Sequence, residues 1–337
     1  MPHYITQLLL SVVSLTPGDT FVSLYESGST DATGAWLQLV DALLALLEVP
    51  RQIVTNGFAR PEGTDRIEFL AKMRNLVSAP MQQMPDLSAP AWPADRLVFV
   101  NDVFFCAGDL MRLLQHEDTD MACGMDFIGW KSPPSTNDIQ PYGPYGPPLS
   151  VVHEPQQLQF YDFWVARDVD GLPLSNVKPF VHHGYSLQRL EQGLPFPVAS
   201  CWNGMVSMNA APFTFHSARF RKAGMGECRE CEAALLCRDF LRLGYSKFVV
   251  DPGVRLAYTA DVARQRYTKK VDIPLAPWAN VTLAGPVDFG YAPQKFHMTC
   301  CNKDADSDNV DFSQCAPEAV VYEREMQPAI RVNSAVF

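Results

Sequence analysis

The sequence predicts an α/β protein built around a largely parallel central sheet. Through the first hundred residues, segments typical of strands alternate with segments of helical periodicity, an order that implies right-handed crossovers between parallel strands. The second observation is the run 97–105, in which four branched and aromatic residues, typical of a buried central strand, end on Asn101-Asp102. With 337 residues, 47% of them hydrophobic, the chain can fill one large domain or two smaller ones.

The N-terminal part alternates helix and strand. The expected elements are a helix at 4–16, a strand at 21–25, a helix at 36–47, a strand at 51–55, a helix at 65–77 behind a Thr64 cap, and the strand at 97–100. Pro17-Gly18 and Val49-Pro50 end the first two helices. A proline-rich surface loop separates the third helix from the strand at 97–100.

The rest of the chain is less regular. We expect a helix at 109–116, a strand at 121–127 that ends on Asp126, a half-buried strand at 160–168, a strand at 198–208 interrupted at Asn203-Gly204, a helix at 231–243, and a strand, turn and strand at 247–258. Residues 131–149 are rich in proline and predict a long loop that borders a site. Residues 1–260 are expected to form the main domain, and 261–337 an irregular wrap with disulfides among Cys300, Cys301 and Cys315.

Composition narrows the class of function. A formal net charge of −10 argues against a nucleic-acid binder, which needs a basic face, so any phosphate partner should be small. Among nine cysteines, Cys228 and Cys231 form a single CxxC, for which burial or disulfides are favoured over zinc. Asn280-Val-Thr282 is a glycosylation sequon, which fits a secretory lumen but also arises by chance. No apolar run reaches the 18 or so residues of a membrane span.

Two polar stretches follow predicted strands. In open α/β sheets, ligands bind outside the carboxyl ends of strands, so we expect Asp102 to hold a divalent metal that in turn holds a diphosphate. The alternative is an aspartate that caps the next turn. In the loop 26–31, Glu26 can accept hydrogen bonds from a ribose or base while loop amides face an anion; the alternative is a capped helix without a ligand.

The Asn203-Gly204 pair lies inside a predicted strand. A glycine in this position indicates a bulge, a hairpin, or a close approach of ligand to backbone.

The order of these motifs resembles a known family. The motifs are Phe21–Thr33, Arg74-Asn75, Asn101–Val103, Cys123–Phe127, Phe160–Trp164, Ser200–Gly204, Cys231-Glu232 with Leu235–Asp239, and Asp251–Val254. Together, over about residues 1–260, they resemble the fungal α-1,3-mannosyltransferases related to the capsule-associated proteins of glycosyltransferase family 69. The resemblance implies a GT-A fold, a nucleotide-sugar-binding sandwich, in an enzyme of the Golgi lumen whose type II membrane anchor lies outside this chain.

The resemblance also implies roles for individual residues. Asn101 and Asp102 fall where GT-A enzymes bind Mn²⁺ or Mg²⁺, although this chain has one acid where two are usual. The remaining positions are Glu26, Ser27 and Asp31 on the nucleoside side, Arg74 and Asn75 at the donor, Trp202, Asn203 and Gly204 beside the transferred sugar, and Glu232 as a catalytic general base or ion-stabilising carboxylate close to the acceptor, with Asp126 and Asp162 as the next candidates for that role. Glu232 begins a helix, which favours its ionised form. Ala233 replaces the family's cysteine.

From the resemblance we expect transfer of mannose from GDP-mannose to a mannose-containing acceptor, forming an α-1,3 linkage with retention of configuration. A transferase that uses another nucleotide sugar differs only in its donor. The alternative of a different class is a non-catalytic lumenal protein that assembles with or regulates glycan-building enzymes. Relatives carry a strand before the equivalent of Pro2, so the sheet is expected to lack its first strand and to expose an edge.

Overall fold

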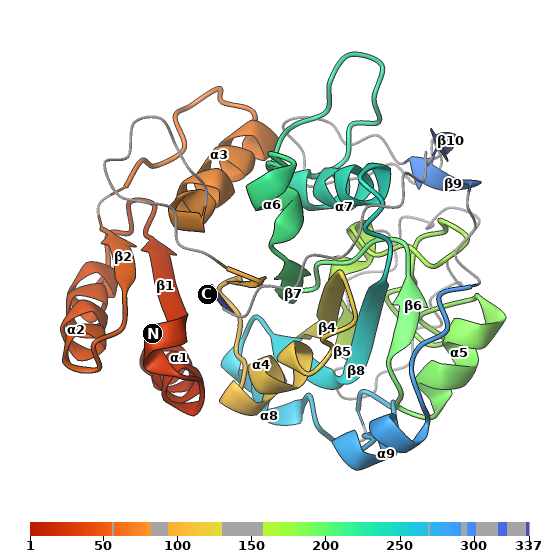
Figure 1. Ribbon diagram of the computed structural model, residues 1–337, viewed down its shortest axis with the longest axis horizontal. Coiled ribbons are helices and arrows are strands. Elements are labelled where there is room, and N and C mark those ends of the chain that lie inside the picture. Colours follow the sequence, from red (N-terminus) through yellow and green to blue (C-terminus); the bar gives the residue numbers. More distant parts are fainter. Residues whose placement is uncertain are drawn as a thin grey trace, which may run out of the picture.

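The computed structural model in Figure 1 describes the chain except for residues 56, 82–93, 130–157, 269, 291–294, 301–315, 322–334 and 337. The proline-rich loop expected at 131–149 therefore lies outside the described residues, as do Cys301 and Cys315. Within the described ranges, no helix has the length and apolar character needed to cross a bilayer.

The N-terminal part follows the expected order. Its elements are α1 (Pro2–Ser14), β1 (Thr20–Tyr25), α2 (Thr33–Leu46), β2 (Arg51–Val54), α3 (Arg66–Ser78) and β3 (Arg96–Val100). Apolar residues on one face of α1 and α2, among them Leu8 and Leu44, pack against Val22 of β1. The expected Thr64 cap of α3 is wrong, because the Asp65 carboxylate accepts the hydrogen bond from the Glu68 N–H at 2.9 Å.

The second part adds more strands and several short helices. Its elements are α4 (Ala107–Leu114), β4 (Met121–Gly129), β5 (Leu158–Phe160), η3 (Asp162–Trp164), α5 (Gly184–Glu191), β6 (Phe196–Val198), β7 (Met205–Asn209), α6 (Ala211–Phe215), α7 (Glu232–Arg242), β8 (Phe248–Ala257), α8 (Ala260–Gln265), α9 (Trp278–Leu283), β9 (Lys295–Cys300), β10 (Ala316–Val321) and β11 (Ala335–Val336). The helices α5, α6, α8 and α9 were not predicted; all are of eight residues or fewer, too short for clear periodicity.

The central sheet is mixed, so the expectation of a largely parallel sheet is wrong. Its order is β2-β1-β11-β3-β7-β4-β8-β6, with β5 also paired to β4. Strand β7 runs antiparallel to both β3 and β4, and β6 runs antiparallel to β8, whereas β1 with β2 and β4 with β8 are parallel. Strand β7 runs in the same direction as β6, the strand before it in the chain, because both are antiparallel to the parallel pair of β4 and β8.

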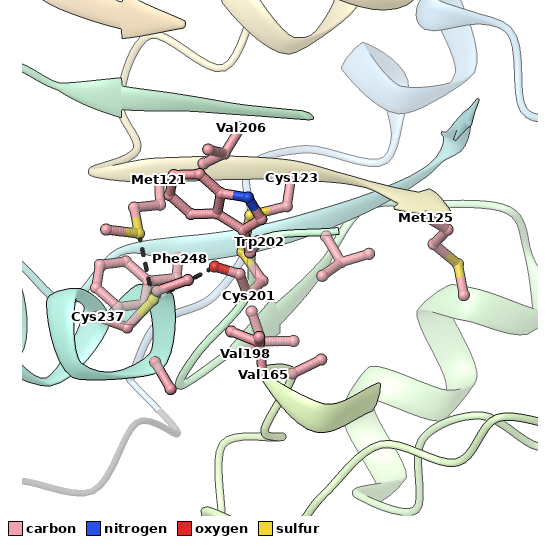
Figure 2. Packing of buried hydrophobic residues seen from close by; sticks show 14 of the residues in the cluster. Met121, Cys123, Met125, Val165, Val198, Cys201, Trp202, Val206, Cys237 and Phe248 are labelled. Carbon is pink, nitrogen blue, oxygen red and sulfur yellow. Dashed lines mark hydrogen bonds between the residues drawn. A yellow bond between two sulfur atoms is a disulfide. The ribbon is translucent and has the colours of Figure 1, made fainter. Parts of the chain in front are cut away.

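Helices cover both faces of this sheet (Figure 1). Alternate residues of β4 and β8 point to opposite faces. Met121 and Phe248 pack with Phe240 of α7 on one face, while Ala122 and Val249 pack with α4 on the other. Figure 2 shows the first of these clusters, in which the Cys237 thiol of α7 lies 3.7 Å from Met121 Sδ and 3.3 Å from the Cys201 carbonyl oxygen. The result is the expected α/β sandwich, with α7 and α4 as its outer layers.

Two predicted strands differ from those observed. The segment 160–168 is not a strand, because β5 ends at Phe160 and Asp162 opens the 3₁₀ turn η3. The strand, turn and strand expected at 247–258 form the single strand β8 with a bulge, since Cys123 pairs with Val250 but Met125 pairs with Arg255. Strand β4 also continues past Asp126, its expected end, to Gly129.

Buried charges hold the bulge of β8. The Asp251 carboxylate accepts two hydrogen bonds from Arg112, at 2.8 and 2.9 Å, and lies 3.0 Å from His116 Nε2. A Cβ on Gly253 would lie 2.3 Å from the Arg112 guanidinium carbon, so a side chain there would displace Arg112 from Asp251. The Asp251–Val254 motif therefore shapes the sheet.

The cysteine pairing also differs from expectation. Cys300 is bonded to Cys228 rather than to a C-terminal neighbour, and a second disulfide joins Cys123 to Cys201. Of the two CxxC cysteines, Cys228 is therefore in a disulfide and Cys231 is a free thiol. Between β1 and β3, the two residues of β11 pair in parallel with both strands. A further strand upstream of residue 1 stays a prediction.

Candidate functional site

The carboxyl groups of Asp126 and Asp162 are both buried and lie close together, near the end of β5. Asp126 of β4 accepts a hydrogen bond from the Asp162 backbone N–H at 3.1 Å through Oδ1, and one from the Tyr258 hydroxyl at 3.0 Å through Oδ2. Burial, and then the charge of Asp162, raises the pKa of Asp126 well above its ordinary value. Burial raises the pKa of Asp162 to about 6, although the Asn203 N–H opposes this shift.

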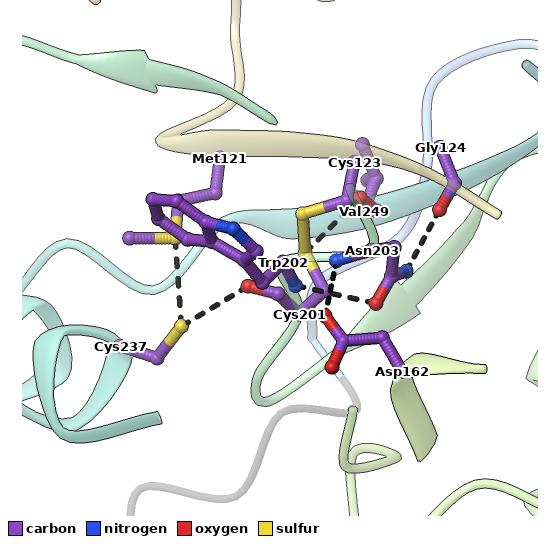
Figure 3. Close-up of a disulfide and its surroundings, with 9 residues drawn as sticks. All are labelled: Met121, Cys123, Gly124, Asp162, Cys201, Trp202, Asn203, Cys237 and Val249. Atoms are coloured by element: carbon purple, nitrogen blue, oxygen red, sulfur yellow. Dashed lines mark hydrogen bonds between the residues drawn. A yellow bond between two sulfur atoms is a disulfide. The ribbon is translucent and has the colours of Figure 1, made fainter. Parts of the chain in front are cut away.

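The turn that leads into β7 faces this pair of acids. Figure 3 shows the Asn203 backbone N–H donating to Asp162 Oδ2 at 2.7 Å, and the Asn203 side chain donating to the Gly124 carbonyl at 2.7 Å. Asn203 and Gly204 have φ values of 58° and 78°, in the left-handed region. A Cβ on Gly204 would lie 3.4 Å from the Asp126 Cβ. The Asn-Gly pair is thus a turn that brings backbone to the acids, not a bulge within one strand.

A disulfide anchors this turn. Cys201, directly before Trp202, is bonded to Cys123 of β4, and both cysteines are fully buried (Figure 3). The bond therefore ties the loop carrying Asn203 to the strand carrying Asp126. No sequence pattern predicted it, because the two cysteines are 78 residues apart.

The third predicted acid, Glu232, is ion-paired. Its Oε1 lies 3.0 Å from Arg74 Nε, and the two side chains are only 2% and 14% exposed. The Arg74 guanidinium lies over the Trp202 ring at 4.2 Å and also near the rings of Phe99 and Phe220. Among the described residues, Glu232 Oε2 and Arg74 Nη1 have no hydrogen-bond partner. This is a buried ion pair inside an aromatic cage.

The charges of the Arg74–Glu232 ion pair and of the two aspartates influence one another. The charge of Arg74 lowers the pKa of Asp162, and the charge of Glu232 raises it. Asn203 links the same carboxylate to Trp202, whose ring packs on Arg74. Asp126, Asp162 and Glu232, the three predicted catalytic acids, are thus brought together with Arg74, Trp202 and Asn203.

Asn75 has a different environment from Arg74. Its amide donates to the Phe220 carbonyl at 2.8 Å and accepts from the Phe220 N–H at 3.0 Å. Both polar ends of the side chain therefore hold the segment that carries Phe220 against Arg74. Contact between Asn75 and a donor stays a prediction.

Asn101 joins the site, while Asp102 lies at its surface. Asn101 donates its backbone N–H to the Gly204 carbonyl at 2.9 Å, and its side-chain oxygen accepts from Trp202 Nε1 at 3.3 Å. Asp102 follows β3 and is exposed. Across the described residues, no three His, Cys, Asp or Glu side chains form a group that could hold a metal ion. A cation at Asp102 would need further ligands from a substrate.

The predicted nucleoside loop is internally bonded. Glu26 is buried and accepts a hydrogen bond from the Ser29 N–H, while the Ser27 hydroxyl donates to the Phe58 carbonyl at 2.6 Å. Asp31 is exposed and accepts from the Thr33 N–H, and hydrogen bonds to Thr33 lower its pKa. These bonds stabilise the loop itself, whereas α2 has Ala32 at its N-cap and no side-chain cap. A nucleoside role for the loop stays a prediction.

The site contains two tyrosines that sequence reasoning missed. Tyr258 follows β8 directly and donates to Asp126, and its ring packs against that of Tyr161 with centroids 4.8 Å apart. The signal was available, because Tyr258 is a polar-tipped residue at the end of a buried strand, as Asn101 is. The Asn280 sequon lies elsewhere, on α9, where Asn280 and Thr282 are exposed.

Comparisons with known proteins place the chain in a family. The chain is 29% identical over 292 residues to a protein named alpha-1,3-mannosyltransferase CMT1 from Cryptococcus neoformans var. neoformans serotype D. The match covers 78% of this chain but 56% of the relative, so the chain spans about half of that protein's length. Residues 1–239 match the family described as Cryptococcal mannosyltransferase 1, and this stretch holds all the predicted site residues. The chain therefore belongs to this family of fungal mannosyltransferases.

Proposed function

We propose that the protein transfers mannose from GDP-mannose to a mannose-containing acceptor, forming an α-1,3 linkage with retention of configuration, on a GT-A type fold. The observation that carries the proposal is the buried group of Asp126, Asp162 and Glu232 around Arg74. Family membership supports the transfer of mannose, and the 29% identity to an α-1,3-mannosyltransferase supports the linkage. Retention comes from the resemblance to glycosyltransferase family 69.

Asp162 is the best candidate for acid–base chemistry. Its pKa of about 6 lies near neutrality, where a carboxyl can both accept and release a proton. Its Oδ2 accepts the Asn203 N–H, and among the described residues its Oδ1 has no hydrogen-bond partner. That oxygen can accept a hydrogen bond from a sugar hydroxyl, or stabilise positive charge at the anomeric carbon.

Glu232, the expected general base or ion-stabilising carboxylate, is suited by its contacts to hold Arg74. Its charge is engaged with the guanidinium at 3.0 Å, and only 2% of its side chain is exposed. Held in this way, Arg74 adds a fixed positive charge beside the acids, which favours a diphosphate that gains negative charge as it leaves. The Trp202 ring lies against the guanidinium, with its centroid 4.2 Å from Arg74 Cζ, and so limits the movement of that group.

We further propose that Asp102, with Asn101 beside it, would hold Mn²⁺ or Mg²⁺. Cations of this kind are often held by one or two carboxylates together with substrate phosphates, and a single exposed carboxylate fits that mode. When bound, the cation would offset the negative charge of the diphosphate. Glu26, Ser27 and Asp31 would contact the nucleoside.

The Golgi lumen is the proposed compartment. The disulfides Cys123–Cys201 and Cys228–Cys300 support it, since disulfides persist in oxidising compartments. GDP-mannose and a glycan acceptor are the proposed partners.

The test is turnover of GDP-mannose by the purified protein, with an α-linked mannobiose as acceptor and with or without Mn²⁺. We expect free GDP and a product whose new linkage is assigned by NMR as α-1,3. Asp162→Asn should lose at least a hundredfold in kcat, while Asp170→Asn, at an exposed aspartate, should not change it.

Donor identity and the alternative function are tested together. Titration with UDP-sugars would reveal a different donor. Binding of neither GDP nor GDP-mannose, with or without Mn²⁺, would instead favour the non-catalytic lumenal protein.

A further inference from the structure

The sequon Asn280-Val-Thr282 is a motif that the candidate functional site does not use. It is the single Asn-x-Ser/Thr triplet of the sequence, and its middle residue is not proline, which would exclude modification. In the structure the triplet occupies the middle of α9, at the edge of the molecule in Figure 1. The sequence alone leaves open whether the triplet is modified, whereas the fold shows what surrounds it.

Helix α9 is held against the body of the protein by residues other than Asn280. Val281, between the two polar residues of the sequon, is 7% exposed and packs in a small apolar cluster with Leu194. The Trp278 ring meets the His116 ring edge to face, with centroids 5.0 Å apart, and the Arg112 guanidinium lies 5.6 Å from the centre of the same indole. These contacts fix which side of the helix faces inward.

The acceptor side of α9 faces solvent. Asn280 and Thr282 are both exposed. Within the part of the chain that the structure describes, the Asn280 side-chain amide makes no hydrogen bond, so its Nδ2 can carry a substituent without the loss of a contact. The Thr282 hydroxyl donates to the Trp278 carbonyl at 3.1 Å, within the helix. A glycan on Asn280 would therefore project into water and displace no packed side chain.

An exposed apolar side chain lies beside the acceptor. Leu283 is 86% exposed and follows Asn280 by three residues, a spacing that places two side chains on the same face of a helix. Single exposed leucines are common, so it is the position of Leu283 next to the sequon that matters. A bulky, hydrophilic glycan on Asn280 would remove part of this apolar surface from water.

The two disulfides support the compartment that the modification requires. Cys123–Cys201 and Cys228–Cys300 are of a kind that persists in oxidising compartments such as the lumen of the secretory pathway. Asn-x-Ser/Thr triplets are glycan acceptors in secreted proteins. This support does not depend on the chemistry of the buried acids.

We propose that Asn280 carries an N-linked glycan whose inner sugars cover Leu283. The donor is an oligosaccharide joined to a lipid diphosphate, and the oligosaccharyltransferase of the secretory pathway supplies the catalysis. Asn280 Nδ2 forms a bond to the anomeric carbon while the bond from that carbon to the phosphate oxygen breaks. The lipid diphosphate leaves, one amide proton passes to a base of the transferase, and no atom is oxidised or reduced.

The experiment expresses the chain behind a cleavable secretion signal in a yeast and digests the combined lumenal and secreted protein with peptide N-glycosidase. The wild type should lose one glycan, seen as a single step in gel mobility, and peptide mass spectrometry should find Asn280 converted to aspartate. Thr282→Ser keeps the acceptor and the hydroxyl and should behave in the same way. Asn280→Gln and Thr282→Ala should migrate, without digestion, as the digested wild type does.

The fraction of monomer tests the contact with Leu283. Asn280→Gln should lose monomer to aggregates in size-exclusion chromatography, and adding Leu283→Lys should restore the monomer. Adding Leu46→Lys instead, at a leucine of α2 that is 80% exposed, is the matched control and should not restore it.

Two results would overturn the proposal. A wild type without the mobility step would exclude the glycan, and an Asn280→Gln variant as monomeric as the wild type would exclude the covering of Leu283. Neither readout requires turnover of a nucleotide sugar, so a failure of the proposed mannosyltransferase function would leave this test intact.

Discussion

Removing either partner of the Arg74–Glu232 ion pair should shift the pKa of Asp162, and the two removals should shift it in opposite directions. Glu232 raises the pKa of Asp162 and Arg74 lowers it. If activity requires ionised Asp162, the acid limb of the pH profile of kcat has its midpoint near the Asp162 pKa of about 6. Glu232→Gln should then move the midpoint to lower pH by about one unit, and Arg74→Met should move it to higher pH by a similar amount.

The same variants have a predictable effect on stability. Both side chains are largely buried, at 2% and 14% exposure, so removing one charge leaves the other without a counterion. Each single variant should lose about 3 kcal/mol of unfolding free energy. The double variant should lose less than the sum of the two, because no unpaired charge remains buried.

Urea denaturation and kcat measured from pH 4.5 to 8.5 supply both readouts. A shift of the two midpoints in the same direction, or no shift in either, would refute the role assigned to Asp162. Arg51→Met, at an ion pair whose partners are 26% and 52% exposed, is the control and should change neither quantity.

Three further predictions follow from the described contacts. Asp102→Ala should abolish both GDP-mannose turnover and its stimulation by Mn²⁺; survival of both would show the metal assignment to be wrong. Because burial raises the pKa of Asp162 from 3.8 to about 6, the folded protein holds a proton that the unfolded chain releases, so the free energy of unfolding should fall as pH rises from about 4 to 6. Asp162→Asn should flatten that slope in urea titrations at pH 4.5 and 7, and an unchanged slope would contradict it. Cys201→Ser should lower the unfolding free energy by about 2–4 kcal/mol and reduce kcat, whereas replacement of the free Cys106 by Ser should leave kcat unchanged.

Much of the local structure could be read from periodicity. The helices at α2, α3 and α7 begin and end within a few residues of their predicted bounds, because their apolar spacing and flanking Gly, Pro or Asp residues are local signals. The strand β3 and its polar end at Asn101-Asp102 were found in the same way. Where a local signal was overridden, as at 160–168, the cause is a distant partner: Asp126 accepts the Asp162 N–H and draws the chain into a turn.

The sequence by itself determined the α/β class, the main helices, and the residue types from which the site is built. Only the tertiary structure decided the antiparallel course of β7, the Cys123–Cys201 bond, the pairing of Glu232 with Arg74, and the place of Tyr258 beside Asp126. The physical reason is the separation along the chain of the residues that interact. Helix periodicity and capping act over a few residues, whereas these contacts join residues far apart in the chain, and their energies depend on burial that no local pattern specifies. At Asn101-Asp102, the sequence located the strand end, and the fold then turned Asn101 toward Trp202 and left Asp102 at the surface.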